Sequence, residues 1–243
     1  MGAGRIRIGT CGWSYDHWDE IFYPVHLPHA ERLTFYAQRF DTVEIDATFY
    51  RLPSEQAVAT WGDAVPEDFT FAAKGSRLIT HYRRLAGVDE AFAAYLERLS
   101  VLGPKLAVVL WQLPPSLPKD IALLERFLTR LPSGPIRHAV EFRHESWLDS
   151  ETFALLRRSG VAQVSVSSDV MPADLTPTAD FVYVRLHGLA DLGGAYGESS
   201  LEPWARFLRY QAERGTDCYV YFNNDFEGHA VADAARLAGM LGT

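Results

Sequence analysis

The sequence predicts a (β/α)8 TIM barrel, in which eight parallel strands alternate with helices and close into a barrel within one domain. Three observations favour this class. Eight segments rich in β-branched and aromatic residues alternate with segments that carry helical periodicity or helix-capping residues. Polar residues concentrate at the carboxyl ends of these segments, where such barrels hold their active sites. The length of 243 residues is typical of one barrel, and no linker divides it, so we expect a single domain over residues 1–243.

The expected strands are mostly apolar on both faces, as in a parallel sheet that is covered on both sides. They are Ile6–Gly12, Thr42–Tyr50, Phe69–Gly75, Leu106–Leu113, Arg137–His144, Ala162–Ser168, Phe181–Gly188 and Asp217–Asn224. The second segment differs because apolar and polar residues alternate along it. This alternation points Glu44 and Asp46 into the barrel, where buried carboxylates need partners or solvent.

Helices are expected between the strands from their start and stop signals. The expected helical segments are His29–Phe40, a helix capped by Ser54 that runs to about Val65, Glu90–Leu99 capped by Asp89, Lys119–Leu131, a helix capped by Asp149 and closed by Gly160, a helix capped by Ser200 and ended by Gly215, and Gly228–Leu241. The connection Asp169–Asp180 is the exception. Pro172 and Pro177 interrupt it, so we expect no helix of more than about two turns there.

Composition limits the classes of partner. The net charge of −8 and the lack of a basic tract argue against extended nucleic-acid binding and against a membrane surface. No apolar run is long enough to span a membrane, and the first residues lack the apolar core of a signal peptide, so we expect a cytoplasmic protein. We expect a monomer with a small-molecule substrate. Cys11 and Cys218 fall at opposite ends of neighbouring strands, which predicts no disulfide.

The carboxyl ends of the strands form the candidate site. Alternation within the strands directs toward the barrel interior Glu44, Asp46, Lys74, Glu141, Arg143, Arg185, His187 and Asn223. Any one of these residues could instead belong to a structural ion pair. Carboxylates, cations and a histidine gathered at one end exceed what packing needs, which favours a functional site. We expect His144 to contact or cap a helix and Trp111 to pack against the helices.

Motifs along the whole chain carry a resemblance to a known family. GTCGWSYDHW, VEIDATFYRLP, FAAKGSRLITH, EFRHESW, VRLHG and YFNNDFEGHA, in this order, resemble the YecE-like proteins of the domain of unknown function 72 family. The resemblance implies a (β/α)8 barrel but brings no established activity or cofactor. This chain has Cys11 where the family often has Ser, and Asp46 where it often has Asn.

The resemblance also singles out individual positions, most of them at the mouth already described. They are Gly9, Gly12, Trp13, Glu44, Thr48, Phe49, Tyr50, Lys74, Thr80, His81, Gln112, Pro114, Glu141, Arg143, His144, Trp147, Arg185, His187, Gly188, Asn223, Asn224 and Gly228.

The leading functional hypothesis is an enzyme that performs acid–base chemistry on a small polar substrate, anionic through a phosphate or carboxylate. Glu44, Glu141 and His187 are the candidate catalytic residues, with pKa values set by burial and neighbouring cations. Lys74, Arg143 and Arg185 would hold the anion. Trp13, Tyr50 and Trp147 would form an apolar rim. The remaining candidate substrate contacts are Asp46, Gly188, Asn223 and Asn224.

Three alternatives remain open. A divalent-metal-dependent barrel, of the isomerase or hydrolase kind, would use oxygen and nitrogen ligands from Glu44, Asp46, Glu141, Asp169 and His187, although the nearby cations compete for these carboxylates. We assign no metal ligand and leave the cofactor unknown. A retaining glycosidase is weaker, because Gln112 and Arg185 stand where its carboxylates commonly lie. A non-enzymatic metabolite- or nucleotide-binding protein would need the same cations but no proton-transfer group.

The loop after the seventh strand is a candidate phosphate site. Gly188, Gly193, Gly194 and Gly197 permit close approach of the backbone to an anion, and Gly228 opens the last helix nearby. The competing interpretation is a mobile lid, since acidic residues in the same loops would repel an anion.

Overall fold

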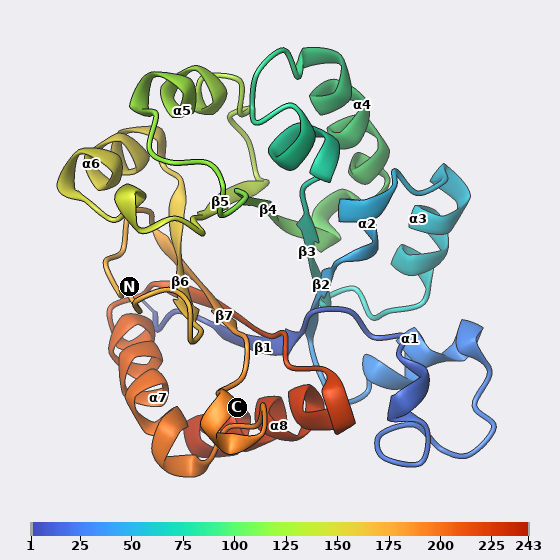
Figure 1. Ribbon diagram of the computed structural model, residues 1–243. Coiled ribbons are helices and arrows are strands. Elements are labelled where there is room, and N and C mark those ends of the chain that lie inside the picture. Colours follow the sequence, from blue (N-terminus) through green and yellow to red (C-terminus); the bar gives the residue numbers. More distant parts are fainter. Residues whose placement is uncertain (1, 243) are drawn as a thin grey trace.

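The computed structural model describes residues 2–242 and confirms the barrel. Eight parallel strands are hydrogen-bonded in the order β1-β8-β7-β6-β5-β4-β3-β2, with helices arranged around them (Figure 1). The strands are β1 Ile6–Thr10, β2 Thr42–Ile45, β3 Thr70–Lys74, β4 Leu106–Gln112, β5 Arg137–Glu141, β6 Ala162–Ser167, β7 Phe181–Leu186 and β8 Asp217–Phe222. Every strand ends before its expected last residue, so several mouth residues lie in the loops that follow.

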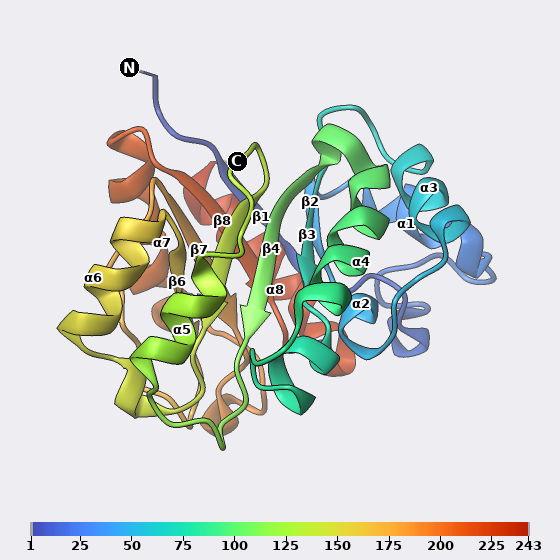
Figure 2. The ribbon, with the colours of Figure 1, turned by 90° about the horizontal axis from the view of Figure 1, so that it is seen from above.

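Helices follow the strands in the expected alternation. They are α1 Arg32–Tyr36, α2 Ala47–Tyr50, α3 Glu55–Asp63, α4 Asp89–Leu99, α5 Ile121–Leu128, α6 Ser150–Ser159, α7 Glu198–Glu213 and α8 His229–Leu241. A side view shows α5 and α6 on one flank of the barrel and α3 and α4 on the other (Figure 2). Within the described residues no helix joins β6 to β7, as expected, and none is long and apolar enough to span a membrane.

Short helical segments occupy parts of the loops. The 3-10 segments are Asp16–Trp18, His29–Glu31, Ser100–Lys105, Glu145–Trp147, Ala190–Leu192 and Phe226–Gly228, and Leu78–Tyr82 is a π-helical turn.

Two of the expected caps are present and two are wrong. Ser54 Oγ accepts from Ala57 N at 3.2 Å, and Asp149 Oδ1 accepts from Thr152 N at 2.8 Å. Asp89 is instead the first residue of α4, and its carboxylate binds Arg130. The helix expected to begin at Ser200 begins earlier, after Gly197, and the Ser200 hydroxyl donates back to Gly197 O within the first turn.

The expected strand Thr42–Tyr50 is too long. The extended backbone ends at Ile45, and the next four residues after Asp46 form the turn α2. Thr48 fixes this turn, because its hydroxyl lies 2.8 Å from Ile45 O and 2.7 Å from Lys74 O. The expected helix His29–Phe40 is likewise shortened to a 3-10 turn followed by α1.

The core has two layers. Small and aromatic side chains fill the barrel, among them Ala72, Val108, Ala139 and Tyr221. A larger layer lies between the strands and the helices. Trp111 belongs to this outer layer, where it stacks on Phe92 with ring centroids 5.4 Å apart, so the expectation that it packs against helices is confirmed.

The barrel closes between β1 and β2. Gly12 N donates to Glu44 O at 2.8 Å, and the Tyr36 hydroxyl accepts from Thr10 N at 2.9 Å and donates to Thr42 O at 3.2 Å. Gly9 permits this closure, since a Cβ there would lie 2.2 Å from Thr42 O.

Replacing Gly9 by Ala is expected to lower the free energy of unfolding by about 1–3 kcal/mol, because the new methyl group meets a backbone oxygen that cannot yield without opening the barrel. At about 2–4 °C per kcal/mol for a chain of this size, thermal unfolding monitored by circular dichroism should show a clearly lowered midpoint.

Gly239→Ala is the matched control. Gly239 is exposed in α8, and a Cβ there meets nothing within 4 Å. Alanine is the better helix former, so this variant should keep the stability of the parent or gain up to about 1 kcal/mol. Equal midpoints for both variants and the parent would contradict the close approach at Gly9.

Candidate active site

Arg185 is the centre of the charged residues at the carboxyl ends of the strands. It lies on β7 and has no exposed surface. Its Nε and Nη2 atoms donate to the two carboxylate oxygens of Glu44 on β2, at 3.1 and 2.8 Å. Its Nη1 atom donates to Glu141 Oε2 on β5, at 2.7 Å. One guanidinium therefore joins three strands across the barrel interior.

The two glutamates are equally buried but differ electrostatically. Burial raises the pKa of Glu44, and the charge of Asp46 adds to this effect, while Arg185 opposes it. The Tyr183 hydroxyl also donates to Glu44 Oε2, at 2.5 Å. For Glu141, burial alone would raise the pKa, but Arg185, the neighbouring His187 and the charge of Arg143 together hold the pKa well below its usual range.

His187 lies above Glu141, just after β7. Its Nε2 atom is 2.8 Å from Arg143 Nη2, and its Nδ1 atom is 2.9 Å from the Asn223 amide. A guanidinium can only donate, so Nε2 accepts and Nδ1 carries the ring proton. The protonated Nδ1 needs an acceptor, so the side-chain oxygen of Asn223, and not its nitrogen, faces Nδ1.

His187 is neutral near pH 7. Burial lowers its pKa to about 4, and the charges of Arg185 and Arg143 add to this effect. The nearby Glu141 carboxylate, 3.7 Å away, acts in the opposite direction but does not prevent the fall of the pKa.

Exposure separates the site into two levels. Glu44, Glu141 and Arg185 have no exposed surface, whereas the side chains of Lys74, His187, Arg143 and Asp46 are 11%, 12%, 19% and 21% exposed. We call these seven residues the mouth cluster. Lys74 Nζ lies 3.6 Å from Asp46 Oδ1 and 4.6 Å from the centre of the Phe49 ring. Three carboxylates face three cations, so the cluster is close to electrically neutral.

Cys11, Glu44 and Asp46 offer ligand atoms within 4.8 Å of one another, a spacing that a metal ion could use. A protein cation already lies among them. Arg185 Nη2 is 3.3 Å from Cys11 Sγ, 2.8 Å from Glu44 Oε1 and 3.8 Å from Asp46 Oδ1. Burial also raises the pKa of the Cys11 thiol well above its ordinary value, so the thiolate that a metal needs is disfavoured. These residues do not fit a divalent metal.

Other residues predicted for the site lie apart from the mouth cluster. Asp169, from the metal hypothesis, is exposed and its carboxylate accepts from Ala190 N. Asn224 is buried, and its amide donates to Gly194 O and to Asp233. It therefore ties the β7–α7 loop to α8.

The predicted aromatic rim is only partly present. Trp13 is half-buried and lies edge-on against Trp61, and Tyr50 is exposed beneath the guanidinium of Arg77. The prediction that Trp147 belongs to the rim is wrong. Its ring is fully buried, stacks on Phe142 and donates its N–H to Leu117 O at 2.9 Å.

Backbone N–H groups of the glycine-rich loop already have partners. Gly188 N donates to the Tyr196 hydroxyl at 3.2 Å, and Gly194 N donates to Leu189 O at 2.9 Å. Gly193 N and Gly228 N also donate to backbone oxygens within their own turns. These four donors would have to leave their partners to bind a phosphate.

The candidate catalytic and substrate-binding residues did not include three contacts of the buried level. Tyr183 binds Glu44, Cys11 lies against Arg185, and Gln112 Nε2 donates to Glu141 Oε1 at 3.0 Å. Alternation in β7 places Tyr183 on the inward face with Arg185, but it does not predict the contact with Glu44. His144 caps the segment Glu145–Trp147 by accepting from Ser146 N, as expected.

The lowered pKa of His187 predicts a pH-dependent contribution to stability. Between pH 6.5 and about 4 the unfolded chain protonates this residue while the folded chain does not, so stability falls as the pH falls through this window. The loss through this residue amounts to about 3 kcal/mol. Urea unfolding at steps from pH 7 to pH 4 should show a shallower loss for His187→Asn than for the parent. Parallel curves would contradict the neutral, buried state of His187.

Known proteins resemble this chain over almost all of its length. A family model described as "Protein of unknown function DUF72" matches residues 7–243. The UPF0759 protein YunF of Bacillus subtilis (strain 168) is 27% identical over 271 residues, which cover 97% of this chain and 94% of YunF. The UPF0759 protein YecE of Escherichia coli O157:H7 is 31% identical over 169 residues, which cover 67% of this chain and 59% of YecE.

Solved structures agree with these matches. A crystal structure of a DUF72 family protein from Thermotoga maritima MSB8 has a TM-score of 0.85 and 29% identity, and covers 98% of this chain and 100% of that one. D-psicose 3-epimerase, crystallised in the presence of D-fructose, has a TM-score of 0.60 and 13% identity, with 98% and 100% covered, and shares the fold alone. Since the family model matches almost the whole chain, this protein belongs to the DUF72 family.

Proposed function

We propose that this protein is an enzyme that performs acid–base chemistry on a small anionic substrate at the carboxyl-terminal mouth of the barrel. The observation that carries this proposal is the two-level arrangement of the mouth cluster. A buried network of Glu44, Arg185 and Glu141 lies beneath two partly exposed cations, Lys74 and Arg143, and the neutral His187.

The cost of the buried network supports a functional role. Taking ions out of water costs several kcal/mol each, and well-packed apolar residues of similar volume are often as stable as a buried ion pair. Below this network the barrel interior contains mainly apolar and aromatic side chains, with a partly exposed ion pair of Arg137 and Asp217 at the opposite end. The buried charges are therefore better explained by function, because they hold Lys74, Arg143 and His187 in place at the mouth.

Lys74 and Arg143 are the proposed contacts for the anion. Both are partly exposed, and both are paired with carboxylates that balance their charge in the free protein. Arg185 is assigned a positioning role, because its three nitrogens are engaged by Glu44 and Glu141 and none of its surface is exposed. Glu44 and Glu141 likewise hold the cations and do not contact the substrate.

His187 is the proposed group that transfers a proton. In the free protein its pKa of about 4 keeps Nε2 unprotonated. A bound anion would favour the protonated imidazole and raise this pKa toward the working range of a general base. Asn223 holds Nδ1, so Nε2 is the atom that faces Arg143 and any bound substrate.

Hydrogen exchange in D2O tests this chemistry. The protein is incubated with a panel of phosphorylated and carboxylated hydroxyketones, and loss of carbon-bound protons is followed by 1H NMR. We expect exchange with at least one anionic compound. His187→Asn should slow it by about 100-fold or more, the usual contribution of a general base, while dissociation constants from calorimetry change little. Lys74→Met should instead weaken binding by about tenfold or more.

Two control variants isolate these effects. His138→Asn changes another buried histidine with a pKa of about 4, at the opposite end of the barrel, and should leave the exchange rate unchanged. Lys119→Met removes a lysine that pairs with Asp149 and Glu151 outside the mouth cluster, and should leave anion binding unchanged. Binding without exchange across the whole panel would favour the non-enzymatic ligand-binding alternative. An equal loss of exchange in the His138 and His187 variants would contradict the assigned base.

A further inference from the structure

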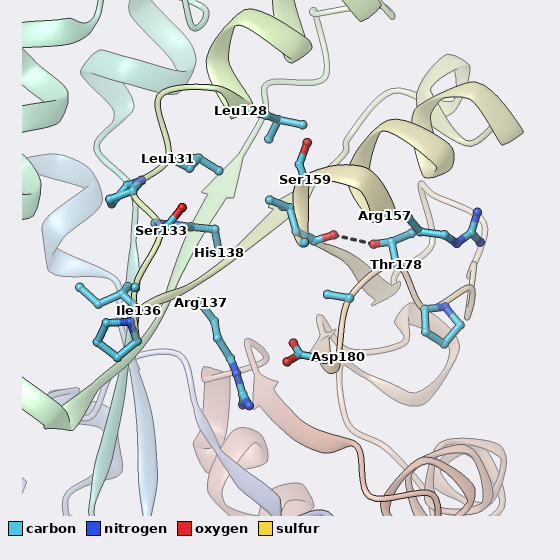
Figure 3. Close-up of a pocket in the computed structure, with 17 residues that line it drawn as sticks. Leu128, Leu131, Ser133, Ile136, Arg137, His138, Arg157, Ser159, Thr178 and Asp180 are labelled. Carbon is cyan, nitrogen blue, oxygen red and sulfur yellow. Dashed lines mark hydrogen bonds between the residues drawn. The ribbon is translucent and has the colours of Figure 1, made fainter.

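A large groove lies at the end of the barrel opposite the mouth. Its volume is about 800 Å³. Arg137 and His138 line it at the start of β5, and Val161 and Asp180 line it immediately before β6 and β7. Figure 3 shows Leu131, Ser133, Ile136 and His138 on one side of the groove and Ser159, Arg157, Thr178 and Asp180 on the other side. Volumes of this size are common for small-molecule sites.

His138 lines this groove and carries an unpaired hydrogen-bond donor. Only 5% of the residue is exposed. The Trp111 indole N–H can only donate, and it lies 3.3 Å from His138 Nδ1, so Nδ1 accepts and Nε2 carries the proton. Within residues 2–242, Nε2 is buried and has no hydrogen-bond partner. Burial lowers the pKa of His138 to about 4, so the ring is neutral near pH 7.

The walls and the charges of the groove indicate the chemistry of a ligand. Leu128, Leu131, Ile136 and Val161 provide apolar surface. The charged lining residues are two arginines, Arg137 and Arg157, and one aspartate, Asp180. Arg137 is already paired with Asp217 at 2.9 Å. Arg157 is therefore the lining cation that has no carboxylate within ion-pair distance among the described residues, which favours an anion beside it.

We propose that this groove is a second ligand site, which binds a small monocarboxylate with an apolar body. His138 Nε2 donates to a carboxylate oxygen, a hydrogen bond that the negative charge strengthens. The body of the ligand packs against the leucine and isoleucine walls, and Arg157 contributes its positive charge at the edge. A ligand there would contact both the 131–136 segment and the connection between β6 and β7. The groove is separate from the mouth cluster.

Two matched probes test the proposal. The whole chain is titrated with sodium benzoate and with benzylammonium chloride, which share an aromatic body but carry a carboxylate or an ammonium group. Calorimetry gives affinity, and long-range 1H–15N spectra of the imidazole rings report on His138. We expect benzoate to bind saturably and to shift the Nε2 resonance of His138, while benzylammonium does neither.

Variants then locate the site. Asparagine can place its side-chain oxygen near the position of Nδ1, so His138→Asn keeps an acceptor for Trp111 and removes the Nε2 donor. It should weaken benzoate binding by about tenfold or more. Arg157→Ala should weaken binding, whereas Arg158→Ala, at the next residue and outside the lining, should not. These two arginines are exposed, so this pair decides the question even where the His138 variant unfolds.

Lys74→Met distinguishes the groove from the mouth, the other proposed anion site, and should leave benzoate binding unchanged. Any of four results would overturn the proposal: no saturable binding of benzoate, equal binding of benzylammonium, unchanged affinity in both the His138→Asn and Arg157→Ala variants, or loss of binding in Lys74→Met. A crystal structure grown with benzoate that shows only a water molecule on Nε2 would also overturn it.

Discussion

The ion pairs of Arg185 with Glu44 and Glu141 are the interaction on which the arrangement of the mouth depends. Three strands that are distant along the chain, β2, β5 and β7, each contribute one charge to the same buried point. Removing any one of the three would leave an uncompensated charge in the barrel interior, which typically costs about 3–5 kcal/mol. Glu141 extends this network upward, because it also binds Arg143 and lies 3.7 Å from His187. The positions of the exposed groups therefore depend on the buried ones.

Much of the fold and part of the mouth could be predicted from the sequence. Alternation of strand and helix patterns is local information, and it was sufficient to place all eight strands. Pro172 and Pro177 predicted that no helix of more than about two turns would join β6 to β7, and the structure has none among the described residues. Period-two alternation also placed Glu141 on β5 and Arg185 on β7 facing inward, because a strand fixes the side of each residue independently of the rest of the molecule.

Other features depend on tertiary contacts and could not be predicted in this way. Residues after Asp46 continue the alternation of a strand, yet Thr48 folds them into a turn through contacts with Ile45 and with Lys74 on a neighbouring strand. Trp147 follows a polar motif but packs against Phe142. Alternation predicts that Arg185 faces inward but not how deeply it is buried. Its hydrogen bonds with two glutamates therefore could not be predicted from the sequence. In the same way, His138 and His187 are both buried with lowered pKa values, and only their positions at opposite ends of the barrel separate their proposed roles.

A double-mutant cycle between Glu141 and Arg185 tests most directly whether the buried network organises the mouth. The free energies of unfolding of Glu141→Gln, Arg185→Met and the double variant are measured by urea denaturation at pH 7. Because each single change leaves the same network broken, the double variant should be about as stable as the less stable single variant, with a coupling energy of at least about 2 kcal/mol. Additive effects, with a coupling energy under about 0.5 kcal/mol, would contradict the central role of this ion pair.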